Sequence, residues 1–228
     1  MLTVLLDFLF PRRSLTGDEG DFITEAELRS LRSTPVIVGT NELRARGMMH
    51  IDRIVAAAAY DSVPLLKKAV QIFKYRKIKS VGETLGSLVS DTSMVLLPRA
   101  ARDAGEGSPV LCPVPLHWVR KFSRGFNQSE VLASIVGWRR GWEVRNLLKR
   151  NRWTGSQVGR TRKERLHGVK DAFEIGLGLG FGLGQKKIPE HVILVDDLST
   201  TGATLDACAE ILKKSGVKTV EGLVIALG

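Results

Sequence analysis

The stretch His191–Leu205, HVILVDDLSTTGATL, is the most informative segment of this chain for predicting its fold. An apolar run rich in β-branched residues ends at Asp196 and Asp197, and a short Ser/Thr/Gly loop then opens into a helical pattern. In open α/β sheets, ligands bind at the carboxyl ends of the strands, which is where both aspartates would lie. We therefore expect a strand over 191–195, a loop over 196–202 and a helix over 203–215 that Gly216 ends.

The two aspartates and the loop after them have the chemistry of a sugar-phosphate site. Adjacent carboxylates accept hydrogen bonds from vicinal hydroxyls, whereas their burial in an apolar core would be costly. Loop N–H groups and the positive end of a helix bind anions, and glycine adopts backbone angles closed to other residues. An ordinary strand–turn–helix with capping hydroxyls would not explain the aspartate pair. The predicted ribose ligands are Asp196 and Asp197, and the predicted 5-phosphate ligands are Ser199, Thr200, Thr201, Gly202, Ala203 and Thr204.

The segments on either side alternate between strand and helix patterns. Thr24, with Glu27 three residues later, has the spacing of a capping box. Alternation of this kind predicts the fold class α/β, with a mostly parallel, twisted sheet flanked by helices. We expect a small N-terminal cap over 1–50 and a larger domain over 51–228. Further strands are expected over 54–60, 109–113, 143–148, 169–175 and 219–226, and further helices over 24–32, 64–74, 80–96 and 127–138.

The composition is that of a folded protein with free thiols. The chain has 228 residues, 43% of them hydrophobic, which excludes wholesale disorder. Its two cysteines, Cys112 and Cys208, cannot build a disulfide framework or a four-ligand zinc site, and we expect both to be packing residues. The start, MLTVLLDFLFPRR, carries Asp7 within its apolar run and no cleavage site, and no apolar run reaches the length of a membrane helix. We therefore expect a cytoplasmic protein without membrane contact.

Positive charge is concentrated in one segment. The chain carries a net charge of +10, and the window from His117 to Lys170 holds fourteen basic and three acidic residues, a net +11. A basic excess confined in this way indicates an anionic partner, either the phosphates of a small molecule or those of a nucleic acid. A solvated charged surface is the alternative. The segment 176–184, GLGLGFGLG, lacks the dinucleotide-binding glycine spacing and is expected to be a flexible connection.

Four motifs together resemble the ComF/GntX family, a competence-associated branch of the type I phosphoribosyltransferases. The aspartates with their loop resemble the motif that binds phosphoribosyl pyrophosphate (PRPP). The resemblance covers about residues 55–228, and His167 departs from it by replacing an asparagine usual in the family. The other motifs are Phe73–Arg76 (FKYR), Pro113–His117 (PVPLH) with Arg124–Gln128 (RGFNQ), and Thr154–Phe173.

The resemblance implies further site residues and a metal. It makes 152–168 a mobile loop that closes over the reaction centre. Mg²⁺ would bridge the pyrophosphate and the ribose hydroxyls, and Asp196 or Asp197 would reach the ion directly or through water. The implied pyrophosphate loop is Val114, Pro115, Leu116 and His117, and the implied pyrophosphate-binding cations are Arg124, Arg160, Arg162, Lys163 and Arg165.

The N-terminal segment departs from the family pattern. Proteins that resemble this family usually begin with a four-cysteine zinc module, but residues 10–50 contain no cysteine and only His50 as a soft ligand. A closed zinc site needs four ligands. We therefore expect no zinc in this segment.

Two main functions are compatible with these features. The first is an enzyme of the pentosyl glycosyltransferase class, which transfers ribose 5-phosphate from PRPP to a nitrogen acceptor and releases pyrophosphate. The second is a non-catalytic PRPP-binding protein or an accessory factor that handles single-stranded DNA during uptake; a ribonucleotide-handling protein without turnover is a weaker third. Stacking on aromatic side chains is usual in single-strand binding. The aromatic residues within the basic segment are Phe122, Phe126, Trp138, Trp142 and Trp153.

Overall fold

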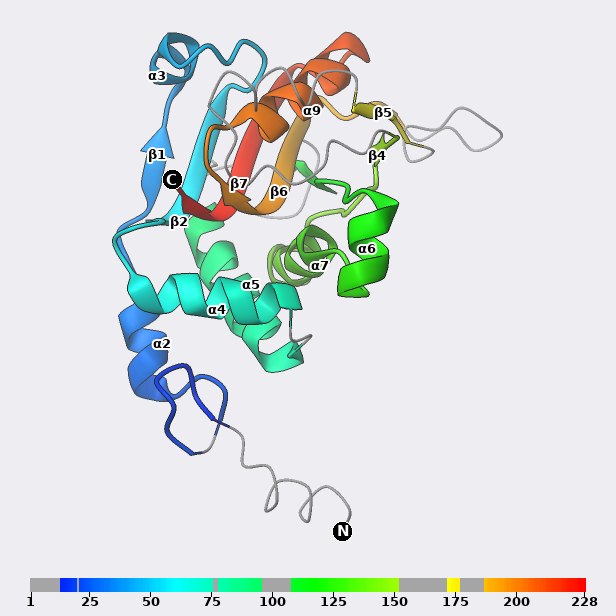
Figure 1. The fold of residues 1–228 in the computed structure, drawn as a ribbon. Coiled ribbons are helices and arrows are strands. Elements are labelled where there is room, and N and C mark those ends of the chain that lie inside the picture. The colour runs from blue at the N-terminus through cyan, green and yellow to red at the C-terminus, as the bar shows by residue number, and fades with distance from the viewer. Residues whose placement is uncertain (1–12, 20, 76–77, 96–107, 152–171, 177–186) are drawn as a thin grey trace.

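The computed structural model describes residues 13–19, 21–75, 78–95, 108–151, 172–176 and 187–228. At its centre lies a five-stranded sheet (Figure 1). The strands are β1 (Val36–Val38), β2 (Arg53–Ala59), β3 (Val110–Pro113), β6 (His191–Ser199) and β7 (Thr219–Leu227). They lie in the order β1-β2-β7-β6-β3; the last four are parallel, and β1 pairs antiparallel with β2 at the edge. The expected mostly parallel α/β sheet is confirmed.

Helices cover both faces of this sheet (Figure 1). One face packs against α3 (Thr40–Ala45) and α9 (Ala203–Lys214), and the other against α4 (Pro64–Tyr75), α5 (Lys79–Ser93) and α7 (Gln128–Arg140). Because alternate side chains of a strand leave opposite faces, Val192 and Leu194 of β6 join the α9 layer, while Ile193 and Val195 join the other. Burial on both faces explains why the central strands are almost continuously apolar.

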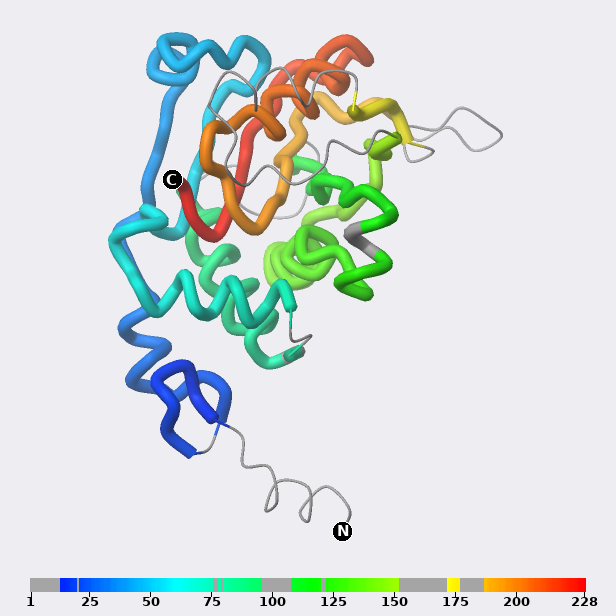
Figure 2. The backbone as a smooth tube through the Cα atoms, viewed as in Figure 1, coloured from blue at the N-terminus to red at the C-terminus, as the bar shows by residue number. Residues whose placement is uncertain are grey.

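The chain before β2 is attached to the main sheet along its edge (Figure 2). Helix α2 (Glu25–Leu31) begins with the predicted capping box, in which Thr24 and Glu27 bond reciprocally to backbone N–H groups. Leu31, at the end of α2, is buried in the α4–α5–α7 layer. Strand pairing between β1 and β2 crosses the predicted boundary between residues 50 and 51. The division of the chain into two domains stays a prediction.

Two predicted boundaries were wrong. The strand expected over 143–148 is instead β4 (Leu148–Arg150), which pairs with β5 (Phe173–Ile175) in a separate two-stranded sheet. Val144 makes only an isolated bridge to Leu111. The loop expected over 196–202 begins later, because β6 continues to Ser199 through its pairing with the end of β7. The short helix α6 (Trp118–Arg124) was not predicted.

Cys112 and Cys208 are free and fully buried in the α9 layer, as expected of packing residues. Burial raises the pKa of the Cys112 thiol to about 12 and that of Cys208 well above its usual range. Among the helices within the described ranges, none is both long and apolar enough to cross a membrane.

Candidate functional site

Asp196 and Asp197 lie near the carboxyl end of β6. Asp196 is half-buried, and its Oδ1 accepts hydrogen bonds from Ser129 Oγ at 2.8 Å and from the N–H of Asp197 at 2.9 Å. Ser129 belongs to the first turn of α7, so a helix far along the chain orients this carboxyl group. The aspartate pair therefore has a defined arrangement before any ligand arrives.

Asp197 lies against a lysine. Its Oδ1 is 3.2 Å from the Nζ of Lys74, and the two side chains are only 11% and 16% exposed. Lys74 stands in the last turn of α4, on the face of the sheet to which Val195 also points. The ion pair thus brings the FKYR motif to the aspartate pair.

The pKa of Asp196 is raised to about 7. Burial of the carboxyl group is the main cause, followed by the charge of Asp197. The hydrogen bonds from Ser129 and from the Asp197 N–H, together with the charge of Lys74, oppose the shift but are smaller. Near neutral pH this carboxyl group can therefore either donate or accept a hydrogen bond, and a bound cation would favour the ionised form.

The turn after β6 leads directly into α9. Gly202 has φ +80° and stands at the N-cap position without a side-chain cap, so its residue type follows from its backbone angle. Thr201 Oγ1 accepts a 3.3 Å hydrogen bond from the N–H of Ala203. Of the predicted 5-phosphate ligands, Thr200 is exposed, Thr201 and Thr204 are half-buried, and Ser199 is buried. The first N–H groups and the positive end of α9 make this turn suitable for an anion.

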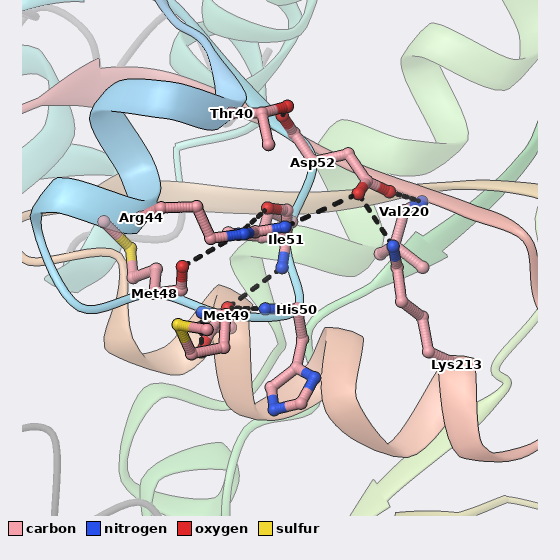
Figure 3. A network of polar contacts seen from close by, with 10 residues as sticks. Thr40, Arg44, Met48, Met49, His50, Ile51, Asp52, Lys213 and Val220 are labelled. Atoms are coloured by element: carbon pink, nitrogen blue, oxygen red, sulfur yellow. Dashed lines mark hydrogen bonds and ion pairs between the residues drawn. The ribbon is translucent and has the colours of Figure 1, made fainter.

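The far side of this turn packs on the loop between α3 and β2. A Cβ atom built on Gly202 would lie 2.1 Å from the Sδ of Met48. The loop itself is held by Asp206 of α9, whose carboxylate accepts the N–H groups of Met49, His50 and Ile51 at 3.1, 2.7 and 2.9 Å (Figure 3).

Asp52 extends the same network. Its carboxylate accepts from Lys213 Nζ at 2.7 Å and from the N–H of Val220 at 2.9 Å (Figure 3). These bonds attach the residues just before β2 to the end of α9 and to the start of β7.

The predicted pyrophosphate loop is partly engaged in the fold. Val114 donates its N–H to Val195 at 2.9 Å, and its carbonyl accepts from Asn127 Nδ2 at 3.1 Å. Pro115 has no N–H. At most, Leu116 and His117 offer backbone N–H groups to a pyrophosphate. The imidazole of His117 is buried, and its Nδ1 accepts a 3.3 Å hydrogen bond from the N–H of Val119.

The RGFNQ segment links this loop to Lys74. Gln128 donates from Nε2 to the carbonyl of Lys74 at 3.3 Å and accepts from Arg124 Nη1 at 3.1 Å. The Arg124 guanidinium lies 5.6 Å from the centre of the Tyr75 ring. Two motifs that are about 50 residues apart in the sequence thus meet beside the aspartates.

Of the predicted pyrophosphate-binding cations, Arg124 alone belongs to the described residues. The predicted mobile-loop residues Arg160, Arg162, Lys163 and Arg165 lie outside the described residues, as does all of the glycine-rich segment except Gly176. Four other basic residues of the segment, all among the described residues, have partners within the protein. Arg139 pairs with Asp91, Arg140 bonds to Ser90 and Ser93, Lys149 pairs with Glu174, and Arg150 lies over Phe173.

The aspartate pair fits the chemistry of Mg²⁺. Asp197 already faces a positive charge, the ammonium group of Lys74, which shows that its carboxylate is oriented to meet a cation. Within the described ranges, no group of three or more His, Cys, Asp and Glu side chains could hold a metal ion. Mg²⁺ commonly takes only one or two carboxylates and completes its shell with water and substrate phosphates. Asp196 and Asp197 would be its ligands here.

Comparison with known proteins gives consistent relatives. No family model matches the chain. It is 28% identical over 179 residues to Competence protein F of Haemophilus influenzae, which covers 75% of this chain and 70% of that protein. It is 34% identical over 108 residues to Competence protein ComFC of Streptococcus pneumoniae, covering 47% and 43%. These similarities support membership of the ComF family.

One further curated protein and one solved structure are also similar to this chain. The DNA utilization protein YhgH of Shigella flexneri is 28% identical over 171 residues, covering 74% of this chain and 69% of that protein. A solved structure titled as that of the allosteric regulatory enzyme of purine biosynthesis matches 68% of this chain and 30% of its own, with a TM-score of 0.40 and 18% identity.

Two residues of this chain had no predicted role although the structure places them at the aspartate pair. Lys74 lies inside the quoted FKYR motif, and Ser129 directly follows the quoted RGFNQ motif. Only their position in or next to a motif pointed to them, because contacts between residues about 120 and 70 positions apart leave no periodic pattern in the sequence.

Proposed function

We propose that this chain binds PRPP and transfers its 5-phosphoribosyl group to a nitrogen nucleophile. The observation that carries the proposal is the aspartate pair at the end of β6, followed at once by the turn 199–204 and the uncapped start of α9. Two carboxylates that can accept hydrogen bonds from vicinal hydroxyls, next to a turn that can bind an anion, fit a ribose 5-phosphate. The competence and DNA-utilization names of the relatives are compatible with such a ligand without specifying it.

In this proposal the chain acts by positioning and by charge. Asp196 and Asp197 accept hydrogen bonds from the ribose hydroxyls, and the turn 199–204 donates to the 5-phosphate. The C1–O bond to pyrophosphate breaks, a C1–N bond forms with the acceptor, and the acceptor nitrogen loses a proton. The positive charge that develops on the ribose ring lies close to two carboxylates, which stabilise it. Mg²⁺, when bound at Asp196 and Asp197, supplies charge neutralisation for the pyrophosphate.

Calorimetry with PRPP and Mg²⁺ tests the proposal. We expect the double variant Asp196→Asn/Asp197→Asn to bind PRPP at least about tenfold more weakly, because hydrogen bonds to charged groups are lost. Asp61→Asn is the matched control, since Asp61 is an exposed aspartate in the turn before α4. Transfer is then measured as pyrophosphate release with a panel of nucleobases and amines. Equal PRPP affinity in the double variant and in the control would contradict the proposed site.

An exposed aromatic pair favours single-stranded DNA as a second ligand. Trp118 and Phe122 are one turn apart on α6 and are 70% and 89% exposed. Aromatic platforms of this kind stack on bases. Fluorescence anisotropy with an oligonucleotide should show a loss of affinity for Trp118→Ala/Phe122→Ala but not for Trp138→Ala, another exposed tryptophan. Equal DNA affinity of the wild-type protein and the two variants would contradict DNA binding by α6.

A further inference from the structure

Lys74 is the closest described cation to the aspartate pair, and nothing in the proposed function so far uses it. Its ammonium group is mostly buried and contacts Asp197 at 3.2 Å. A buried lysine needs a counter-charge, and here the counter-charge is one of the proposed Mg²⁺ and ribose ligands. The lysine therefore occupies a place where ligand and cation are expected to gather.

The backbone of Lys74 is fixed independently of this ion pair. Its carbonyl accepts the amide of Gln128, and Gln128 is in turn bonded to Arg124. The neighbouring Phe73 ring is buried and lies 5.6 Å from the Phe126 ring. The side chain of Lys74 can thus change partner while its Cα stays in place, since four rotatable carbons separate the charge from the backbone.

Electrostatic repulsion favours a move of the Lys74 ammonium group from Asp197 to another anion when a metal ion binds. A divalent cation that binds Asp197 would lie close to the ammonium group of Lys74, which is 3.2 Å from the same carboxylate, and the two positive charges would repel one another. PRPP brings a pyrophosphate group with several negative charges to the same place. An ammonium group displaced from Asp197 would find phosphate oxygens within its reach.

We propose that Lys74 is a movable counter-ion: it neutralises Asp197 in the free protein and binds the pyrophosphate of PRPP once Mg²⁺ occupies the carboxylates. This role rests on the proposed function. It makes Lys74 a competitor of the metal when no substrate is present and a ligand of the substrate when it is bound.

The two halves of this role predict opposite effects of one substitution. In Lys74→Met the carboxylates lose their internal cation, so we expect the ligand-free protein to bind a divalent cation about threefold or more tightly. The same variant lacks a charge-assisted bond to phosphate, so we expect PRPP and inorganic pyrophosphate to bind about tenfold more weakly. A merely structural role would weaken both or change neither.

The experiment uses the full chain and two readouts. Binding of Mn²⁺ to the ligand-free protein is followed by electron paramagnetic resonance, and binding of PRPP or pyrophosphate with Mg²⁺ by calorimetry. Lys74→Arg keeps the charge and should restore much of the pyrophosphate affinity. Lys68→Met is the matched control, because Lys68 is an exposed lysine of the same helix. Circular dichroism shows whether each variant is folded.

The outcomes separate this proposal from the function on which it rests. Tighter Mn²⁺ binding with weaker pyrophosphate binding in Lys74→Met, and neither change in Lys68→Met, supports the counter-ion role. A different result would overturn the role of Lys74 alone: the wild-type protein binds PRPP, and Lys74→Met binds both PRPP and Mn²⁺ with unchanged affinity or weakens both affinities equally. Wild-type protein that binds neither PRPP nor pyrophosphate overturns the proposed function and the pyrophosphate half of the role together.

Discussion

At the scale of single residues, Asp196 places opposite demands on folding and on ligand binding. Its carboxyl group is half-buried beside Asp197, and this environment raises its pKa to about 7. In the unfolded chain the same group ionises near pH 4. Between these two values the unfolded state has released a proton that the folded state still holds, so the free energy of unfolding falls as pH rises.

Asp196→Asn should therefore stabilise the free protein in a pH-dependent way. The amide carries no charge, so the variant lacks the loss of stability that the wild-type chain suffers between about pH 4 and pH 7. One pKa unit corresponds to about 1.4 kcal/mol, so a pKa that moves from near 4 to about 7 predicts a stability difference that grows by about 4 kcal/mol across this range and then levels off. Urea unfolding of both proteins at pH 4.5 and pH 8 measures it.

Asp61→Asn serves as the control for this measurement, because that aspartate is largely exposed. The large pH-dependent gain in stability expected of Asp196→Asn should be absent from this variant. A difference between Asp196→Asn and the wild type that is the same at both pH values would contradict the raised pKa. The gain in stability should be accompanied by weaker PRPP binding, as is common at functional sites that retain strained or repelling charges.

At the scale of elements, α5 and α7 approach closely because α5 carries glycines on its contact face. A Cβ atom on Gly86 would lie 2.6 to 2.9 Å from three carbons of the Ile135 side chain. Gly82 lies between two helices, since a Cβ atom there would lie 2.9 Å from the Phe73 ring of α4 and 3.5 Å from the Val131 side chain of α7. Helix α7 carries Ser129 at its start, so this contact also sets where the Asp196 hydrogen bond is made.

Gly86→Ala should destabilise the protein although alanine is the better helix former. Helix propensity alone would favour the change by about 1 kcal/mol, but overpacking costs about 1 to 3 kcal/mol, and we expect a net loss. Chemical denaturation measures it. In Gly86→Ala/Ile135→Ala the loss should be smaller than the sum of the single losses, because the two changes relieve one another.

Gly39→Ala is the comparison for crowding, since nothing lies within 4 Å of a Cβ atom at that position. Its φ of −84° is open to alanine. A loss for Gly39→Ala as large as that for Gly86→Ala would show that crowding against α7 is not the cause.

At the scale of the whole molecule, one carboxylate ties the N-terminal part of the chain to the candidate site. Asp206 of α9 accepts three consecutive N–H groups from residues about 155 positions earlier (Figure 3). The loop that it holds presses Met48 against Gly202. The segment before β2 therefore takes part in shaping the 5-phosphate turn.

Asp206→Ala should lower both stability and PRPP affinity. Three backbone donors lose their acceptor, and leaving such groups unpaired costs about 1 to 3 kcal/mol each where they are buried; we expect a total loss of about 2 to 4 kcal/mol, since this loop is partly exposed. Thermal unfolding and PRPP calorimetry measure the two effects. Glu210→Ala, one turn further along α9, removes the partly exposed ion pairs with His50 and Lys214 and should change both quantities less than Asp206→Ala does. An Asp206→Ala protein as stable as the control would contradict this account.

Features that depend on interactions between neighbouring residues could be predicted from the sequence alone. The capping box at Thr24 and the alternation of strands and helices that indicates a mostly parallel sheet follow from local patterns of hydrophobicity and turn chemistry, whereas β1, α3 and α6 were not predicted. The stretch 191–205 likewise predicted a strand, a turn and a helix with an aspartate pair between them. These features could be predicted because side-chain alternation and helix caps act over a few residues.

Features that depend on contacts between distant segments could be identified only in the folded molecule. The extension of β6 to Ser199 requires pairing with β7, and the edge strand β1 requires β2 as its partner. Lys74 of α4 and Ser129 of α7 contact the aspartate pair from the helix layer on the face of the sheet away from α9. Such contacts depend on how the layers stack, and no local pattern in the sequence records which side chain of one layer will meet a given side chain of another.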